Sequence, residues 1–322
     1  MTPIPRHRTP RLSATAFTGA LAYAVLGACA SSPERDAQKW DRDSQRLAAV
    51  LRARTDPDSL AAASLLVLSK HLADAQALMA RAAATANRAD LAWLHMSVCG
   101  QTPGCESTSL EERLRHLDPD NGAGWMGALH RASTPRDEAG IDAALSAMGR
   151  TTRFDVYWTS LAARLSRAIA ASGQMRLPIA ITLVMGQLAA LAIPSYQDSM
   201  NACKGEGLDR PGRRDNCRAV ATSFRNGDTF MTEMIGVAIA KRVWPADSAE
   251  YRDALEARRR YDYRTQAWGT AGVMAMLSPR KTEEYVQVLA DHRREQEVLK
   301  AQLISHHIDP TPPADWPAKA QP

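Results

Sequence analysis

The helical organisation of this chain is clearest around one stretch, Asp118-Pro119-Asp120-Asn121-Gly122-Ala123-Gly124-Trp125. The capping box Ser109-Leu110-Glu111-Glu112 predicts a helix before it, and the proline and the aspartates predict that this helix ends there. Outward from Trp125, further tryptophans stand 32 residues before it, at Trp93, and 33 residues after it, at Trp158. Asp56-Pro57-Asp58 precedes Asp118-Pro119-Asp120 by 62 residues, which is nearly two such spacings. The spacing predicts a helical unit that recurs between roughly residues 57 and 170.

This period resembles that of tetratricopeptide repeats, which are helix pairs of about 34 residues with a Trp near the start of the first helix. Asp118-Pro119-Asp120-Asn121 running into Trp125 is similar to a linker that leads into a new repeat. The period is not kept after about Ser172. The resemblance implies an all-α fold in which stacked helical hairpins occupy residues 37–172, and an irregular helical bundle is the alternative fold.

The composition also favours packed helices over sheets. Hydrophobic residues make up 45% of the chain and aromatic residues only 6%. Alanine is abundant, and runs of β-branched residues are almost absent. A length of 322 residues suits one large domain or two small ones behind a leader. We therefore expect a second helical region over residues 173–308.

Three features organise this second region. The most hydrophobic segment behind the leader lies between Pro178 and Pro194 and carries no charge. It is shorter than the roughly 20 apolar residues that span a bilayer, so we expect a buried core helix over residues 178–194 rather than a membrane segment. Pro279 predicts the start of one last helix, whose apolar stripe runs from Tyr285 to Leu303. The proline-rich residues 309–322 predict a disordered or extended tail.

The N-terminal residues have the pattern of an export signal. A basic segment with Arg6, Arg8 and Arg11 precedes an apolar run from Ala14 to Leu26, and small residues follow. This order is typical of a secretory signal peptide.

The last residues of this signal, Leu26-Gly27-Ala28-Cys29, resemble the lipobox of bacterial lipoproteins. The resemblance implies that the Cys29 sulfur is lipidated, that residues 1–28 are removed and that residues 29–36 form a tether. Two or more acyl chains hold a protein stably on a bilayer, so the membrane is an expected partner. Because Ala30 rather than Asp follows Cys29, the resemblance favours the outer membrane, with the domain facing the periplasm. A plain secretory signal that is cut elsewhere is the alternative.

The charge of the chain comes largely from this leader. Residues 1–28 hold three arginines and no acidic residue, so their removal takes the net charge from +5 to about +2, with 37 basic against 35 acidic residues. The remaining balance gives no reason to expect nucleic acid as a partner. Arg258-Arg259-Arg260 follows Glu256 at helical spacing and is interpreted as a solvated helix face.

Four further cysteines, Cys99, Cys105, Cys203 and Cys217, are an even number in an exported chain, which indicates disulfides. We favour the two local pairs, because Gly, Pro and Gly separate the first two sulfurs and a polar loop separates the others. A metal site that uses His95 and Cys99 is the rival interpretation. Neither cysteine pair has the short spacing of zinc ligands, so we expect neither a metal nor a cofactor.

The sequence carries no Gly-rich phosphate loop, no His-Glu-x-x-His and no Gly-x-Ser-x-Gly. We therefore expect a non-enzymatic envelope lipoprotein whose helical stack binds a partner protein or peptide. The alternative is a helical domain that encloses a small apolar or envelope-derived ligand, with Ile179–Ile193 lining the cavity. A third hypothesis is a peptidoglycan-active enzyme, because Glu106-Ser107 and Met185-Gly186-Gln187 resemble two of the three sequence marks of lytic transglycosylases; the third, Ala-Tyr-Asn, is absent.

Overall fold

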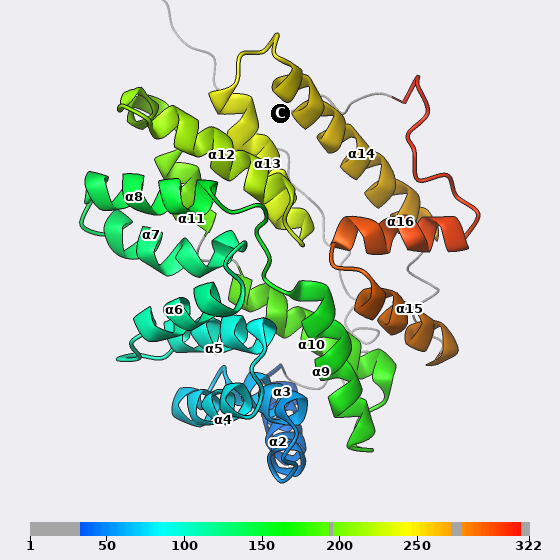
Figure 1. Ribbon diagram of the computed structural model, residues 1–322. Coiled ribbons are helices and arrows are strands. Elements are labelled where there is room, and N and C mark those ends of the chain that lie inside the picture. Colours follow the sequence, from blue (N-terminus) through cyan, green and yellow to red (C-terminus); the bar gives the residue numbers. More distant parts are fainter. Residues whose placement is uncertain (1–32, 193–195, 272–278, 317–322) are drawn as a thin grey trace, which may run out of the picture. The chain divides into compact units, whose positions relative to one another are not determined.

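The computed structural model describes residues 33–192, 196–271 and 279–316, and within these ranges the regular secondary structure is helical. One isolated β-bridge joins Asn121 to Arg153. The prediction of an all-α fold is confirmed (Figure 1). The predicted signal peptide, the Leu26-Gly27-Ala28-Cys29 stretch and the predicted tether up to residue 32 lie outside the described residues. The chain divides into two units, Met1–Asp43 and Ser44–Pro322, and the buried apolar core of the described residues belongs to the second.

The helices of the first half pack in the order in which they follow in the chain. The first of them is α2 (Pro33–Arg52), whose C-terminal part belongs to this unit. It is followed by α3 (Pro57–Val67), α4 (Leu72–Thr85), α5 (Ala89–Gln101), α6 (Thr108–Leu117), the 3-10 turn η1 (Gly122–Trp125), α7 (Met126–Ser133) and α8 (Glu138–Gly149). From α3 to α8 each element contacts the next, as a stack of helices requires. The three tryptophans stand at different helix positions, however. Trp93 is inside α5, Trp125 ends η1 and Trp158 begins α9.

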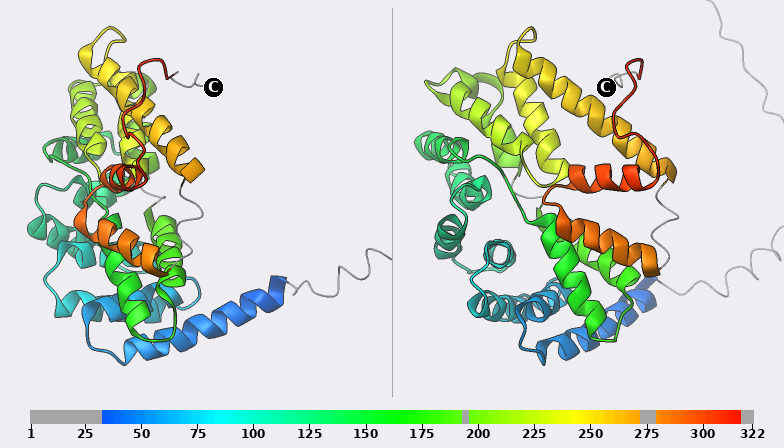
Figure 2. Two further views of the ribbon diagram at one scale, coloured as in Figure 1. Left: turned by 90° about the vertical axis from the view of Figure 1, so that its right-hand side faces the viewer. Right: turned by 45° about the vertical axis from the view of Figure 1, so that its right-hand side comes forward.

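The second half continues this chain of neighbours back to its beginning. Its helices are α9 (Trp158–Ala171), α10 (Leu177–Ala192), α11 (Tyr196–Ala202), η2 (Gly205–Asp209), α12 (Arg213–Arg225), α13 (Phe230–Val243), α14 (Ala249–Ala271), α15 (Pro279–Asp291) and α16 (Glu295–Ser305). α12 packs on α8, α13 on α12, α14 on α13, and α16 on α14. α15 then packs on α16, α9 on α15, and α3 on α9. The contacts between helices of this unit therefore form a closed circuit (Figure 2).

One continuous apolar core runs through this circuit. Its aromatic centre joins three segments, because the Phe154 ring lies 4.4 Å from that of Phe224 and 5.8 Å from that of Tyr196. α12 and α13 approach so closely that a Cβ atom at Gly236 would lie 2.7 Å from the backbone nitrogen of Arg225 and 2.9 Å from the backbone oxygen of Ala221. Only glycine allows the middle of α13 to approach the C-terminal end of α12 this closely.

Both predicted disulfides are present. Cys99 is bonded to Cys105 across the turn after α5, and Cys203 is bonded to Cys217 across η2. By loop-closure entropy the two bonds contribute about 2 and about 3 kcal/mol, respectively, as upper estimates. Among the described residues there is no group of three or more potential metal ligands.

The apolar segment forms a helix, as predicted, but it is buried on one side only. On α10, Ile181, Val184 and Leu188 are buried, whereas Ile179 is 46% exposed. The prediction of a buried core helix therefore holds for one side of α10 only. Its exposed positions include Gly186, Ala189 and Ala190, whose small side chains leave little apolar surface in water. Among the described residues, α10 begins the one helical stretch that could cross a membrane, judged by length and composition only.

The single last helix that the sequence predicts is in fact two. α15 ends at Asp291 and α16 begins at Glu295. In a continuous helix the Glu295 backbone N–H would donate to the carbonyl four residues earlier. It donates instead to the carbonyl oxygen of Asp228 at 2.8 Å. The Thr159 hydroxyl donates to the Arg293 carbonyl at 3.1 Å. Contacts with distant residues therefore end a helix that its apolar stripe would continue.

Residues 309–316 of the C-terminal tail, which the sequence predicts to be disordered or extended, form no helix or strand; residues 317–322 lie outside the described part. The tail lies on α14, where the Tyr263 hydroxyl donates to the Asp309 carbonyl at 3.0 Å and Arg264 Nε donates to the Pro310 carbonyl at 2.9 Å. The rings of Tyr263 and Trp316 are 5.5 Å apart. Proline has no N–H, so the tail needs partners chiefly for its carbonyls, and α14 supplies them.

Candidate functional site

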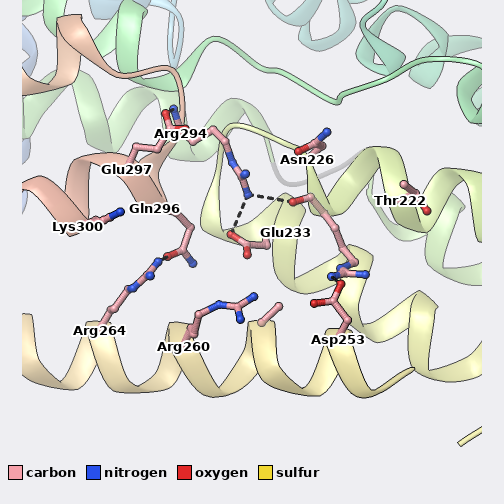
Figure 3. A pocket seen from close by; sticks show the side chains of 12 residues that line it. Thr222, Asn226, Glu233, Asp253, Arg260, Arg264, Arg294, Gln296, Glu297 and Lys300 are labelled. Atoms are coloured by element: carbon pink, nitrogen blue, oxygen red, sulfur yellow. Dashed lines mark hydrogen bonds and ion pairs between the residues drawn. The ribbon is translucent and has the colours of Figure 1, made fainter. Parts of the chain in front are cut away.

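A polar cleft of about 520 Å³ opens between α12, α13, α14 and α16. We call it the arginine cleft. Charged and polar side chains line almost all of it (Figure 3). The lining residues are Thr222, Arg225, Asn226, Glu233, Asp253, Ala257, Arg260, Arg264, Arg294, Gln296, Glu297 and Lys300.

Helical spacing places these side chains on facing surfaces. Arg260 and Arg264 are four residues apart on α14 and therefore share a face. Gln296 and Lys300 stand in the same relation on α16. In Figure 3 both arginines rise from α14 towards α13 and α16, where Glu233 stands on α13. The cleft is thus built from one face of each of three helices, with the end of α12 closing one side.

The cleft holds more positive than negative charge. Five cations line it (Arg225, Arg260, Arg264, Arg294 and Lys300) against three carboxylates (Glu233, Asp253 and Glu297), a difference of +2 when all are ionised. Arg225 forms an ion pair with Asp253. Burial raises the pKa of Glu233, and the nearby Arg294 guanidinium, 3.5 Å away, opposes this shift. Any protonation of Glu233 would increase the positive excess.

Among the described residues, Arg264 forms no ion pair. Its Nε donates to the Pro310 carbonyl at 2.9 Å, and its Nη1 donates to Gln296 Oε1 at 3.1 Å, so both acceptors are neutral. Burial lowers the pKa of Arg264, and the charge of Arg260 lowers it further, while the Glu233 carboxylate opposes this shift. A guanidinium in this state gains from an anionic partner, because an opposite charge nearby stabilises its ionised form.

Arg294 is held in the cleft by backbone oxygens. Its Nε donates to the Gly227 carbonyl at 3.2 Å and its Nη2 donates to the Arg225 carbonyl at 3.0 Å. Gly227 itself has no room for a side chain, since a Cβ atom there would lie 2.8 Å from the Phe154 oxygen and 2.9 Å from the Phe224 oxygen. The loop between α12 and α13 therefore fixes the loop between α15 and α16.

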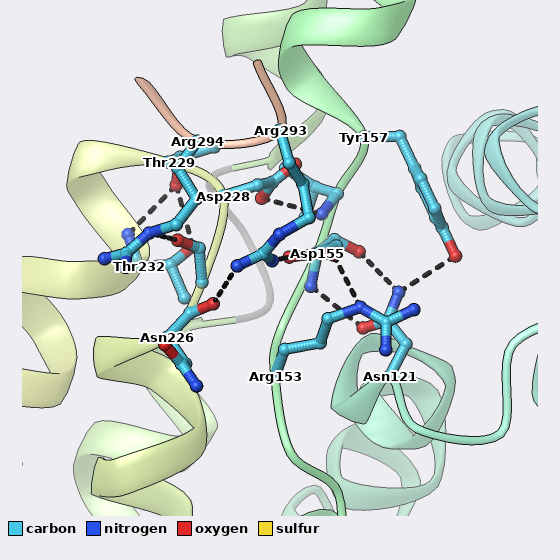
Figure 4. Close-up of polar contacts among 12 residues, drawn as sticks. Asn121, Arg153, Asp155, Tyr157, Asn226, Asp228, Thr229, Thr232, Arg293 and Arg294 are labelled. Atoms are coloured by element: carbon cyan, nitrogen blue, oxygen red, sulfur yellow. Dashed lines mark hydrogen bonds and ion pairs between the residues drawn. The ribbon is translucent and has the colours of Figure 1, made fainter. Parts of the chain in front are cut away.

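A network of buried carboxyl and amide groups and partly exposed arginines, which we call the polar hub, ties these loops to the first half of the domain (Figure 4). It consists of Asp118, Asn121, Arg153, Asp155, Tyr157, Asp228 and Arg293. Asp155 forms ion pairs with Arg153 and Arg293, and Arg153 also pairs with Asp118. Segments that lie up to 138 residues apart in the sequence meet here.

Asp228 caps the start of α9 from within this hub. Its Oδ1 accepts from the Val156 N–H and its Oδ2 accepts from the Trp158 N–H, both at 2.9 Å. Burial, and then the charge of Asp155, raises the pKa of Asp228 to about 8, while the two N–H donors oppose this shift. Since both oxygens hold backbone donors, the role that this geometry supports for Asp228 is to position helices.

The residues predicted from sequence do not gather at the cleft. Cys29 lies outside the described residues. None of the four bonded cysteines is among the described residues that line the cleft. The same holds for Arg258 and Arg259: Arg258 pairs with Asp262 at 2.9 Å, and Arg259 binds the tail, where its Nε donates to the Trp316 carbonyl at 3.2 Å. Of these three arginines only Arg260 lines the cleft. The helix face that the sequence predicts to be solvated therefore contributes one residue to the cleft.

The two stretches that resemble lytic transglycosylase marks are not brought together. Glu106 and Ser107 line a second cleft beside α5 and α7, and no residue of Met185-Gly186-Gln187 is among the described residues lining it. The capping box predicted at Ser109 is not formed, because α6 begins at Thr108. Glu111, in the same segment, pairs with Arg131 at 2.6 Å.

Sequence reasoning missed the arginine cleft because its residues are spread from position 222 to position 300. One local signal was available. Arg260 and Arg264 share a helix face, and no acidic residue stands four positions after either of them.

A scan against protein-family models finds no match for this chain, and neither do searches of curated proteins and of solved structures. What the domain binds must therefore be inferred from the charges and geometry of the cleft.

Proposed function

We propose that this protein is a non-enzymatic, lipid-anchored envelope protein whose helical domain binds an acidic segment of a partner protein in the arginine cleft. The observation that carries the proposal is Arg264, a partly buried cation whose two acceptors are neutral and whose neighbour is another arginine. An aspartate or glutamate of a partner would supply the missing charge. Guanidinium and carboxylate groups also match in shape, because two parallel N–H donors meet two oxygens.

The cleft is organised before any ligand arrives. Arg264 is held by the tail and by Gln296, and Arg294 is held by two backbone carbonyls. Side chains that are already fixed lose little conformational entropy on binding, so more of the interaction energy appears as affinity. The positive excess also attracts an acidic segment from a distance, an effect that salt screens.

The mixture of charges favours a peptide over a simple anion. Glu233, Asp253 and Glu297 stand among the cations, so the cleft can discriminate between a segment with suitably spaced carboxylates and one with evenly spread negative charge. Repulsion between these carboxylates and wrongly spaced carboxylates of another segment would exclude that segment, which is a common source of specificity.

Binding can be measured by fluorescence anisotropy with a rhodamine-labelled peptide of alternating Glu and Gly, and with a matched peptide of Gln and Gly. We expect saturable binding of the Glu peptide only. Arg264→Met should weaken it about tenfold or more, since a hydrogen bond to a charged group contributes about 1.5–3 kcal/mol.

Arg280→Met is the matched control, because it removes one positive charge from a side chain that is 90% exposed and outside the cleft. Its effect should stay within about twofold. Equal losses in the two variants would mean that the peptide responds to net charge and not to the cleft. Tight binding of free pyrophosphate with no binding of the Glu peptide would show that the ligand of the cleft is a small anion and not an acidic segment.

The anchor is a separate part of the proposal. It is supported by the order of charge, apolar run and Leu26-Gly27-Ala28-Cys29 in the sequence, and by two disulfides, which persist in oxidising compartments. Labelled palmitate should enter the wild-type protein and not Cys29→Ala. Equal label in both would show that Cys29 is not the lipidated residue.

A further inference from the structure

A second cavity, of about 500 Å³, lies on a different face of α13 from the arginine cleft. Glu233 faces the cleft, whereas Met231 and Met234 line this cavity. We call it the methionine pocket. α9, α10, α11 and α14 contribute further walls through Trp158, Ala189, Met200 and Tyr261.

The lining of the methionine pocket is suited to an apolar molecule. Its side chains are mostly aliphatic, aromatic or thioether groups, and among the described residues that line it none is Lys or Arg. Met231 is 44% exposed, so an apolar surface is open to solvent here. Close-packed interiors have few voids larger than a water molecule, and pockets of this volume with apolar walls are the usual sites for small ligands. Methionines adapt their shape to what they contact.

Few polar groups border this apolar surface. The indole Nε1 of Trp158 is buried under other protein atoms, so it is not offered to a ligand. The hydroxyls of Thr229 and Tyr261 and the carboxyl of Glu295 are the other polar groups in the described lining. Glu295 Oε2 accepts from the Phe230 N–H at 2.6 Å.

The charge state of Glu295 bears on which ligand fits. Burial raises the pKa of this carboxyl to about 7, so near neutral pH a large part of it is uncharged. With no cation in the described lining and one carboxyl beside it, the site does not suit an anion such as a free fatty acid.

We infer that the methionine pocket binds a neutral, apolar small molecule. This inference does not rest on the acidic-segment proposal, because it concerns a different face of α13 and a ligand of opposite character. Of the segment Ile179–Ile193, which the sequence predicted to line such a cavity, Ala189 alone is among the described lining residues.

The test uses prodan, a neutral naphthalene dye with a carbonyl acceptor, whose emission shifts to shorter wavelength in an apolar site. Wild-type protein should bind it saturably, one dye per chain, with blue-shifted emission. Ala238→Trp fills the pocket and should weaken binding about tenfold or more. Leu255→Trp places the same side chain at a position that is 41% exposed and outside the pocket, and should leave binding within about twofold.

If Ala238→Trp fails to fold by circular dichroism, Ala189→Trp replaces it, because Ala189 lines the pocket from an exposed position on α10.

Any of three results would overturn the inference that the methionine pocket binds a ligand. Dye uptake could fail to saturate, it could be unchanged by the pocket-filling variants, or it could depend on a second copy of the chain at the stoichiometry of a dimer. The acidic-peptide assay distinguishes this failure from failure of the proposed function, because Ala238→Trp should leave affinity for the Glu peptide unchanged.

Discussion

Replacing Asn121 by alanine should destabilise the domain more than its small size suggests. Asn121 is 1% exposed and makes four hydrogen bonds within the polar hub. Its Oδ1 accepts from the N–H groups of Ala123 and Asp155 at 3.0 and 2.9 Å. Its Nδ2 donates to the Asp155 carbonyl at 2.9 Å and to the Tyr157 hydroxyl at 3.0 Å.

The size of the loss depends on the groups left without partners. Alanine would leave two buried N–H donors unsatisfied, at about 1–3 kcal/mol each, and one carbonyl oxygen. The Tyr157 hydroxyl still donates to Asp118 Oδ2 at 2.6 Å, so its loss is small. A water molecule in the space vacated would recover part of the cost. We therefore expect Asn121→Ala to lower the free energy of unfolding by about 3–4 kcal/mol, and no charge changes in this substitution.

Urea unfolding followed by far-ultraviolet circular dichroism, with the disulfides intact, measures this loss. Asn201→Ala is the matched control, because the Asn201 side chain is exposed and accepts one hydrogen bond, from Gln197 Nε2 at 2.9 Å. It should cost less than about 1 kcal/mol. If the two variants lose the same amount, the polar hub does not hold the loops of the arginine cleft in the way described.

Gly227→Ala should destabilise the domain by more than about 2 kcal/mol, because two of the atoms that its Cβ would meet within 2.9 Å belong to the backbone. Gly186→Ala should stabilise α10 by about 0.5–1 kcal/mol, because its Cβ would meet nothing within 4 Å. Thermal unfolding temperatures that moved in the same direction for both variants would contradict this. Because the folded pKa of Glu295, about 7, exceeds its usual 4.5, the folded protein keeps a proton that the unfolded chain releases, and stability should fall as pH rises between these values. Glu295→Gln cannot ionise, so between pH 4 and pH 8 it should gain about 3 kcal/mol relative to wild type, and parallel pH profiles would refute the assignment. Removing the second disulfide with Cys203→Ser and Cys217→Ser should cost about 3 kcal/mol, seen as an earlier urea midpoint under oxidising conditions and as no difference after reduction of both proteins.

Features of the fold that depend on neighbouring residues could be predicted from the sequence. Asp56-Pro57 predicts a helix start, and in the structure Asp56 Oδ1 accepts from the Ser59 N–H at 2.8 Å with Pro57 as the first residue of α3. The disulfides belong to the same class, since turn chemistry between Cys99 and Cys105 brings their sulfurs together. Short-range rules suffice wherever both partners lie within one turn or loop.

Features that depend on distant partners could not be predicted in this way. The apolar stripe of residues 279–305 gives no sign that Asp228, 67 positions before Glu295, would accept the Glu295 N–H and separate α15 from α16. The proline-rich tail has the composition of a disordered segment, yet α14 supplies hydroxyl and guanidinium donors for its carbonyls. On α10, uncharged small residues satisfy both a buried and an exposed face, so the pattern did not distinguish them.

The arginine cleft is the extreme case of this second class. Its charges come from four helices, and each of them taken alone is an ordinary amphipathic surface. Only the circuit of helix contacts brings Arg260 and Arg264 opposite Arg294 and Lys300. The excess of positive charge is therefore a property of the fold and not of any local stretch.

The most direct test of the acidic-segment proposal is a two-dimensional proton–nitrogen NMR titration that observes the arginine Nε–Hε groups as the Glu peptide is added. Single arginine variants assign the signals. We expect the signals of Arg264 and Arg294 to move saturably and with one dissociation constant, while that of Arg280, outside the cleft, stays in place. Movement of all three signals in proportion, without saturation, would contradict a specific site in the cleft.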